Sequence, residues 1–176
     1  EGSGNFLSQN KTDKVIYKLK KNNETYNFET KFIIEKNPLI IDFLGYEKKS
    51  NFKANINLKG SYLAGKKTVI QTFSLNENEN KFQINQLNLD KNFRVLNFKK
   101  INLNYLDKDL KKNDFSIINL RNKYSLAGSK FNANNLIESL INSDDSKDTK
   151  IFNQNFDVDI KIKQVYLDKD FEIKDL

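Results

Sequence analysis

Apolar and polar residues alternate with a period of two along most of the chain. Residues 51–60 show the pattern most clearly, since one side of an extended chain would carry Phe52, Ala54, Ile56 and Leu58. Lys and Asn occupy the other side. Strict alternation is typical of a β-strand with one buried face. The stretch therefore predicts a strand, and the question is what its apolar side contacts.

Similar segments before and after this stretch predict a sheet of many strands. The alternating segments cover residues 15–19, 26–34, 69–75, 82–89, 93–98, 101–105, 115–120, 124–127 and 156–162. A Lys-Lys-Asn-Asn-Glu turn between the first two predicts a hairpin. Pro38 is expected to end the second strand, because proline has no N–H to donate to a ladder. The apolar phase changes between Ile84 and Leu87, which predicts a bulge near Gln86.

A five-residue motif with Leu-Asp-Lys at its start recurs at residues 89–93, 106–110 and 167–171. Each copy follows a strand pattern, and Asp and Asn side chains bind the backbone of tight turns. We therefore expect three hairpin turns. The alternative is that paired carboxylates such as Asp107 and Asp109 bind calcium or act as acid and base. The motif lacks the Gly and Glu positions of an EF-hand loop, and a glycosidase would need two carboxylates that face a cleft.

One helix is predicted at residues 133–142, where Leu136, Ile137, Leu140 and Ile141 form an amphipathic stripe. Asn132 suits its N-cap. The fold class predicted is mainly β, an extended and curled antiparallel sheet built as a meander of hairpins with this one short helix. The predicted organisation is a β region over residues 1–142, a polar linker over 143–155, and the start of a following β repeat over 156–176.

Composition narrows the possible chemistry. The chain has 176 residues, 38% of them hydrophobic, and contains neither Cys nor His. Thiol chemistry, disulfides, imidazole bases and the commonest zinc ligands are thereby removed. No apolar run approaches the roughly 20 residues of a membrane span. We expect no enzymatic activity, no metal and no cofactor. The chain also has no Met, so we interpret it as a fragment of a longer protein.

The net charge of +7 comes almost entirely from lysine, because Arg94 and Arg121 are the only arginines. A nucleic-acid reader is expected to use arginine for bidentate base and phosphate contacts. Here lysines alternate along the strands with Asn, Asp and Glu, which favours solvated outer faces and no nucleic-acid partner. A basic nucleic-acid-binding β domain remains an alternative, and salt dependence of binding would reveal it.

Three stretches resemble the AsmA-like family, in particular its YhdP-type members from Gram-negative bacteria. LGYEKKSNFKANINL at residues 44–58 resembles their LGW-x-K-x-x-G-x-x-A pattern. NKYSLAGSKFNANNLIESL at 122–140 resembles their Y-x-L-x-G-x-x-L-D-x-x-x-L-L strand, turn and helix. VYLDKDFEIKDL at 165–176 resembles the hairpin that opens a following AsmA-like repeat. The chain departs at Ser50 or Asn51, where the family has Gly, and at Asn132, where it has Asp.

The resemblance implies a bridge-like lipid-transport protein of the periplasm, anchored in the inner membrane by an N-terminal helix outside this chain. Such a protein moves phospholipid toward the outer membrane and serves outer-membrane biogenesis. Its sheet would offer an apolar groove to acyl chains, and any envelope protein partner is unknown. The groove residues expected here are Phe52, Ala54, Ile56, Leu58, Phe82, Ile84, Ile101, Leu103, Tyr105, Phe156, Val158, Ile160 and Ile162.

A closed core is the alternative to this groove. Each apolar face could pack on another sheet or on the helix, as in a sandwich, giving a structural or scaffolding β domain of a cell-envelope protein. The two hypotheses differ in whether other elements pack over the apolar faces of the strands. One short helix cannot cover so many strands, so a closed core would need further apolar cover.

Overall fold

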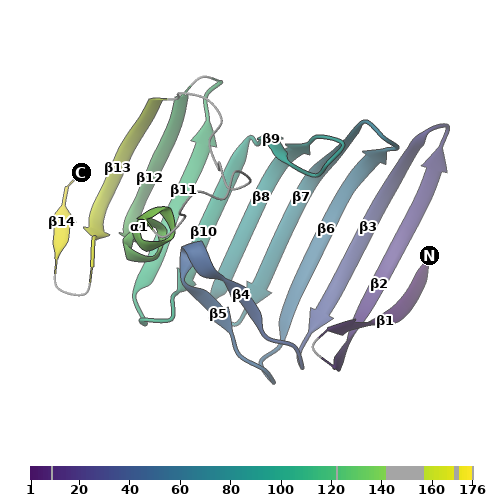
Figure 1. Ribbon diagram of the computed structural model, residues 1–176, viewed down its shortest axis with the longest axis horizontal. Coiled ribbons are helices and arrows are strands. Elements are labelled where there is room, and N and C mark those ends of the chain that lie inside the picture. Colours follow the sequence, from purple (N-terminus) through teal and green to yellow (C-terminus); the bar gives the residue numbers. More distant parts are fainter. Residues whose placement is uncertain (9, 122, 142–156, 169–170, 176) are drawn as a thin grey trace. The chain divides into compact units, whose positions relative to one another are not determined.

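The alternating segments form an open, mostly antiparallel sheet (Figure 1). The computed structural model describes the chain except residues 9, 122, 142–156, 169–170 and 176, and it leaves the side chains of 139–141 undescribed. Contacts divide the chain into two compact units, the first with Glu1–Leu39 and Lys48–Leu103, the second with Ile40–Glu47 and Asn104–Leu176. The predicted linker at 143–155 lies outside the described residues.

The first unit contains a sheet in which each strand is antiparallel to its neighbour. The strands, in hydrogen-bonded order, are β1 (Gly2–Ser8), β2 (Lys11–Asn22), β3 (Thr25–Ile34), β6 (Ala54–Leu63), β7 (Lys67–Glu77) and β8 (Asn80–Leu89), and β9 (Val95–Asn97) pairs with β8. The hairpin predicted between β2 and β3 is confirmed, with Asn23 in the left-handed region of its turn. β1 was not predicted, because its sequence does not alternate.

The second unit contains β11 (Lys112–Asn119), β12 (Lys123–Asn132), β13 (Asp157–Tyr166), β14 (Glu172–Lys174), α1 (Asn134–Ile141) and the 3₁₀ turn η1 (Asp42–Leu44). The expectation of an antiparallel meander is wrong at one place, because β12 and β13 are parallel. A parallel neighbour needs a crossover, and α1 lies in that connection. β13 therefore belongs to the same sheet as β12.

Three elements contain the boundary between the units, namely β4 (Leu39–Ile41), β5 (Tyr46–Lys48) and β10 (Lys100–Leu106). β4 pairs with β5, while β10 stands between β8 and β11 in the order of hydrogen-bonded strands. The predicted mainly-β class with one short helix among the described residues is confirmed.

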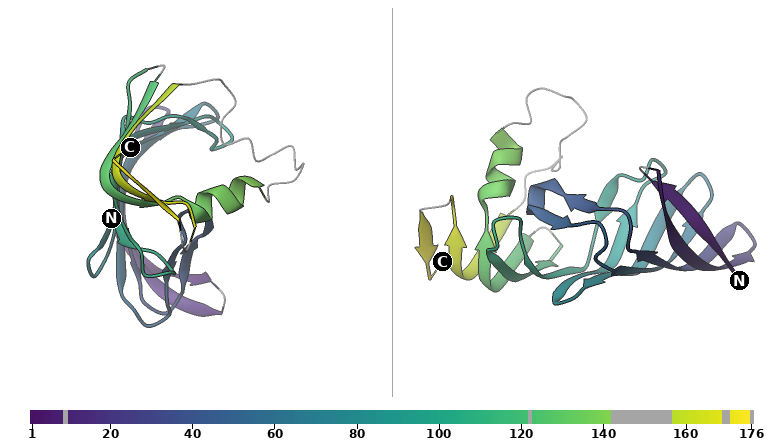
Figure 2. Two further views of the ribbon diagram at one scale, coloured as in Figure 1. Left: turned by 90° about the vertical axis from the view of Figure 1, so that its left-hand side faces the viewer. Right: turned by 90° about the horizontal axis from the view of Figure 1, so that it is seen from below.

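The predicted change of phase at Gln86 is confirmed, but β8 has no extra residue relative to β7. Thr72 pairs with Asn85 and Ile70 pairs with Leu87, so the β7–β8 ladder skips Gln71 and Gln86 opposite each other without a register shift, and Gln86 has a φ of 51°. The bulge lies on β7, where Gln71 is the extra residue relative to β6. The skip returns Leu87 to the face that carries Ile84. Bulges also bend a strand, and Figure 2 shows the strands bent along their length.

The three predicted hairpin turns form by one mechanism. The Asp90 carboxylate accepts hydrogen bonds from the backbone N–H groups of Asn92 and Arg94, at 2.8 and 2.9 Å. The Asp107 carboxylate accepts the backbone N–H groups of Asp109 and Lys111 in the same way. Asp168 accepts the N–H of Phe171. The turns lead from β8 to β9, from β10 to β11 and from β13 to β14. Their carboxylates are therefore occupied by the backbone.

One strand end agrees with the predicted segment for a different reason, and one strand is shorter than predicted. β3 ends at Ile34, as the alternation over 26–34 indicated, but Pro38 lies four residues later: the Asp13 carboxylate accepts the N–H groups of Glu35, Lys36 and Asn37 and takes them out of the ladder. The segment predicted at 93–98 shortens to β9, because the residue at 93 has a φ of 61° within the turn.

The helix begins slightly later than predicted. Its first hydrogen bond runs from the N–H of Ile137 to the carbonyl of Ala133, so Ala133 occupies the N-cap. Asn132 still serves the helix start, since its Oδ1 accepts the N–H of Asn134 at 3.3 Å. Figure 2 shows α1 projecting away from the strands of its own unit. The helix therefore leaves much of that sheet face uncovered.

Candidate functional site

The first unit carries a continuous apolar face across five strands. Residues directly opposite each other in an antiparallel pair share a face. One row of such partners runs from β2 to β8 through Val15, Phe32, Ile56, Leu75 and Phe82. Aromatic and aliphatic side chains from strands far apart in the sequence are thereby brought side by side.

Two further rows extend this surface, which we call the first apolar face. The second row contains Tyr17, Thr30, Leu58, Phe73 and Ile84. The third contains Leu19, Phe28, Gly60, Ile70 and Leu87. A side chain at Gly60 would come within 2.4 Å of the Val69 carbonyl oxygen, so glycine is required where β6 approaches the bulged β7.

Most of the first apolar face is accessible to solvent. Tyr17 is 46% exposed and Leu19 is 56% exposed, while Phe28, Phe32, Ile56, Leu58 and Phe73 are partly exposed. A packed core would bury such side chains almost completely. Contiguous exposed apolar surface of this kind marks a site for a partner or ligand.

One end of the face is closed; we call it the closed margin. Ile34, Ala54, Leu75 and Phe82 are buried there. Asp13 and Glu77 continue the alternation of β2 and β7 onto the same end, and both are also buried. The closed margin is therefore packed and polar at its edge, unlike the middle of the face.

The positive charge of Lys48 offsets the negative charges of Asp13 and Glu77 in the closed margin. Its side chain is fully buried, and Nζ donates to the carbonyl oxygens of Glu35, Asn37 and Lys49 at 3.1, 2.7 and 3.1 Å. Burial lowers the pKa of Lys48, and the carboxylates of Asp13 and Glu77 oppose that effect. A buried ammonium that donates to three backbone carbonyls has a structural role.

The opposite end of the face is aromatic and partly exposed, because Tyr26 and Tyr62 are partly exposed while Thr68 is buried; we call it the tip margin. Its row contains Lys21, Tyr26, Tyr62 and Thr68 beside the turns that end β2, β6 and β8. The Tyr26 and Tyr62 ring centroids are 6.3 Å apart, and Phe93 stacks on Tyr62 at 6.4 Å. The apolar face is therefore asymmetric along its strands.

The second unit repeats this asymmetry on its own sheet. Ile117, Leu126 and Ile160 form one row, and Ile160 is 45% exposed. Toward α1 the corresponding side chains are buried, including Phe115 and Phe131, whose rings are 4.6 Å apart. The second unit therefore also has one packed end and one exposed apolar end.

The packed end of the second unit is organised by Asp107. Its Oδ2 accepts hydrogen bonds from the side-chain amides of Asn113 and Asn132, at 3.1 and 2.7 Å. An aspartate at 132, as in the AsmA-like pattern, would place a second carboxylate against Asp107. The asparagine is therefore the donor that this position requires.

Most of the predicted groove residues of the first unit lie on its apolar face. Ile56, Leu58 and Ile84 lie together on the first apolar face and are partly exposed. Ala54 and Phe82 lie on the same face but are buried. Leu103 and Ile101 follow on β10, since Asn102 between them donates to Gln83 of the polar face. The prediction for residues 51–60 was wrong at its start, because Phe52 lies in a bend and β6 begins at Ala54.

The remaining predicted residues belong to the second unit. Tyr105 is a core residue and not a groove residue, because it is fully buried, packs edge-on against Tyr46, and its hydroxyl donates to the Leu44 carbonyl at 2.9 Å. Burial, and to a lesser degree Asp107, raise the pKa of Tyr105. Val158 and Ile160 are exposed, Ile162 is buried, and Phe156 lies outside the described residues.

The sequence interpretation omitted several members of the first apolar face, among them Val15, Phe28, Phe32 and Phe73. Their alternation was visible, because each lies in a predicted strand. The strand order that places them beside Ile56 and Leu58 was not visible. Alternation shows which residues of one strand share a face, but it does not show which strands are neighbours.

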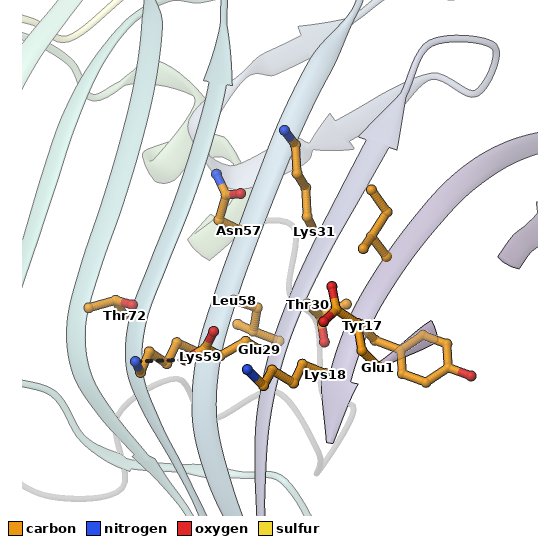
Figure 3. A pocket seen from close by; sticks show the side chains of 11 residues that line it. Glu1, Tyr17, Lys18, Glu29, Thr30, Lys31, Asn57, Leu58, Lys59 and Thr72 are labelled. Carbon is orange, nitrogen blue, oxygen red and sulfur yellow. Dashed lines mark ion pairs between the residues drawn. The ribbon is translucent and has the colours of Figure 1, made fainter. Parts of the chain in front are cut away.

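The polar side of the first unit holds a shallow hollow of about 430 Å³ (Figure 3). Lys18, Glu29, Lys59 and Thr72 cross it in one row, and Lys59 pairs with Glu29 at 2.7 Å. That ion pair lowers the pKa of Glu29, but both side chains are more than half exposed. Paired surface charges of this kind contribute little, so the hollow is a weaker candidate than the apolar face.

The described parts of the chain contain neither a cluster of metal-ligating side chains nor a helix that could cross a membrane. No three His, Cys, Asp or Glu side chains there gather as a metal site. No described helix has the length and hydropathy to cross a bilayer. Comparison with known proteins adds nothing further, since no family model, curated protein or solved structure matches the chain.

Proposed function

We propose that this chain is part of a non-enzymatic lipid-transport protein of the AsmA-like type, which shields phospholipid acyl chains on its apolar sheet faces between inner and outer membranes. One observation carries the proposal: the first apolar face is continuous over five strands and remains partly exposed. The motifs that resemble the AsmA-like family support the same proposal, and they imply a periplasmic, inner-membrane-anchored whole protein.

The energetics of lipid transfer explain why such a surface is useful. Exposing acyl chains to water costs roughly 0.8 kcal/mol per CH₂, so two sixteen-carbon tails cost on the order of 20 kcal/mol. An open apolar face removes most of that cost without residue-specific chemistry. The headgroup can stay in water at the edge of the sheet.

The proposal predicts that a charge on the first apolar face abolishes lipid binding. Ile56 lies between Phe32 and Leu75, and its neighbour Asn57 points to the opposite face. We expect Ile56→Asp to remove co-purified phospholipid and Asn57→Asp, which makes the same charge change, to retain it. Native mass spectrometry with lipid extraction, on protein expressed in a Gram-negative host, measures both.

Stability distinguishes an open face from a closed core. On an open face, Ile56→Asp should lower the free energy of unfolding by no more than about 2 kcal/mol. Unfolding of the variant would place Ile56 in a closed core, because an unpaired buried charge is strongly destabilising. A lipid-free, stably folded wild type would instead favour a structural role. Ile160→Asp tests the second unit in the same way.

A further inference from the structure

The first apolar face has two chemically different ends. A phospholipid also has two different ends, a polar headgroup and apolar acyl chains. The closed margin offers no room for a headgroup, because Asp13, Lys48 and Glu77 are buried there together. Lys48 already uses three backbone carbonyls. A ligand on this face can therefore place a polar group in water at the tip margin.

The tip margin carries side chains that suit a boundary between hydrocarbon and water. The Tyr62 hydroxyl reaches the turn beyond its strand, where it accepts the N–H of Gly65 at 3.4 Å. Lys21 Nζ lies 5.4 Å from the Tyr26 ring centroid. Tyrosine and lysine combine an apolar body with a polar end, and both are favoured where acyl chains meet headgroups.

Charge at the tip margin is positive. Its row and the turns beside it carry two acidic side chains, Glu24 and Asp90, and four basic ones, Lys21, Lys66, Lys91 and Arg94. Lys20 and Lys67 lie at the same strand ends but alternate onto the polar face. Glu24 lies 3.8 Å from Lys66, and Asp90 accepts backbone N–H groups of its own turn. The cationic excess therefore complements an anionic group.

The length of the face also matches an acyl chain. Tyr62 and Ala54 lie eight residues apart on β6, which corresponds to about 26 Å at strand rise. One leaflet of a bilayer has about 15 Å of hydrocarbon, half of the roughly 30 Å core. An acyl chain that begins at the tyrosines can therefore lie along the strands without reaching the closed margin.

We infer that the tip margin is a headgroup site that binds the phosphodiester of an anionic glycerophospholipid, while the acyl chains run along the strands toward Ala54. The inference rests on the proposed function and adds to it an orientation and a headgroup preference. Lys21 and Lys66 bring positive charge to the phosphate. Tyr26 and Tyr62 mark the depth at which the acyl chains begin.

The test is competition between lipids on the intact chain. Wild type, Lys21→Gln/Lys66→Gln and a control, Lys14→Gln/Lys31→Gln, are incubated with equimolar phosphatidylglycerol and phosphatidylcholine vesicles. The control removes the same charge from the polar face, where Lys31 is opposite Ile16 and Lys14 is opposite Ile33. Native mass spectrometry then measures the ratio of the two bound lipids and their total.

We expect wild type and control to enrich phosphatidylglycerol, and the tip-margin variant to lose at least about threefold of that enrichment while total bound lipid is kept. The enrichment should also decrease as salt rises from about 0.05 to about 0.5 M. Equal enrichment in both variants, or a loss of both lipids together, overturns the headgroup site. Displacement of lipid by soluble glycerol phosphate overturns it as well, because the site would then bind free phosphate.

Failure of the headgroup site and failure of the proposed function give different results. A wild type that binds neither lipid contradicts the proposed function itself. A wild type that binds both lipids without preference leaves the apolar face in place and removes the headgroup site alone.

Discussion

Asp13 shows how one carboxylate decides where a strand ends. Its Oδ1 accepts the N–H groups of Glu35 and Lys36, and its Oδ2 accepts those of Asn37, backbone and side chain, all at 2.8 to 2.9 Å. Burial by itself would raise the pKa of Asp13, but these hydrogen bonds together lower the pKa to about 2. The ionised form is therefore strongly preferred in the folded protein.

This pKa predicts an acid-dependent loss of stability. Because the folded pKa lies below the ordinary value of 3.8, the stabilisation is complete above pH 3.8 and is lost as pH falls toward 2. The contribution is about 2 kcal/mol. Denaturant unfolding between pH 6 and pH 2 should show that Asp13→Asn is less stable at pH 6 and less sensitive to acid. Glu79→Gln, in an exposed turn, serves as control, and an equal pH response in both variants would contradict the role of Asp13.

At the scale of elements, a glycine allows η1 and α1 to approach each other closely. Gly45 has a φ of 59°, and a Cβ there would lie 2.3 Å from the Asn135 side-chain nitrogen. Asn135 is buried on α1, and its side-chain amide has no hydrogen-bond partner among the described residues. The glycine in the Leu-Gly-Tyr motif therefore permits both the turn and the close approach of the helix.

Gly45→Ala should destabilise the protein more than the same change at Gly65. Gly65 also has a positive φ, 65°, but a Cβ there meets nothing within 4 Å. Gly65→Ala should therefore cost about 1 kcal/mol from backbone strain alone, and Gly45→Ala about 2–3 kcal/mol with overpacking added.

Urea unfolding of the two glycine variants measures this difference. Adding Asn135→Ala to Gly45→Ala should recover part of the loss, because it removes the atoms that clash. Equal costs at Gly45 and Gly65 would show that α1 does not pack against Gly45.

At the scale of the whole molecule, the net charge of +7 is divided between very different environments. Some lysines lie in ion pairs on polar faces, such as Lys59 with Glu29 and Lys123 with Asp159. Lys48 is buried, and others surround the tip margin. Apart from the tip margin, lysines alternate along the strands with Asn, Asp and Glu, and Arg94 is the one arginine of the first unit, whereas nucleic-acid readers rely on arginine for phosphate and base contacts.

Binding to single-stranded DNA should accordingly be weak and steeply dependent on salt. We expect dissociation constants above about 10 μM near physiological ionic strength, since dispersed lysines give the electrostatic term alone. Fluorescence anisotropy with a labelled oligonucleotide, titrated at several salt concentrations, measures this. Micromolar or tighter binding at physiological salt would contradict the lipid proposal and favour a nucleic-acid-binding domain.

The local structure of this protein could be predicted from short-range patterns in its sequence. The alternation around Ile56, the hairpin between β2 and β3, the change of phase at Gln86 and the three Asp turns were all predicted, because each depends on residues within a few positions of one another. Such signals arise from backbone geometry and from side chains that bind their own turn.

Which faces meet and which stay open could not be predicted in this way, because both depend on contacts between distant strands. Ile56 lies beside Phe32 and Leu75, and Asp13 binds residues 22 to 24 positions away. The same alternation produces the buried Leu75 and the exposed Leu19, and a similar pattern made Tyr105 resemble a groove residue. Strand order and cover depend on contacts between distant segments, and the periodicity of a single strand carries no information about them.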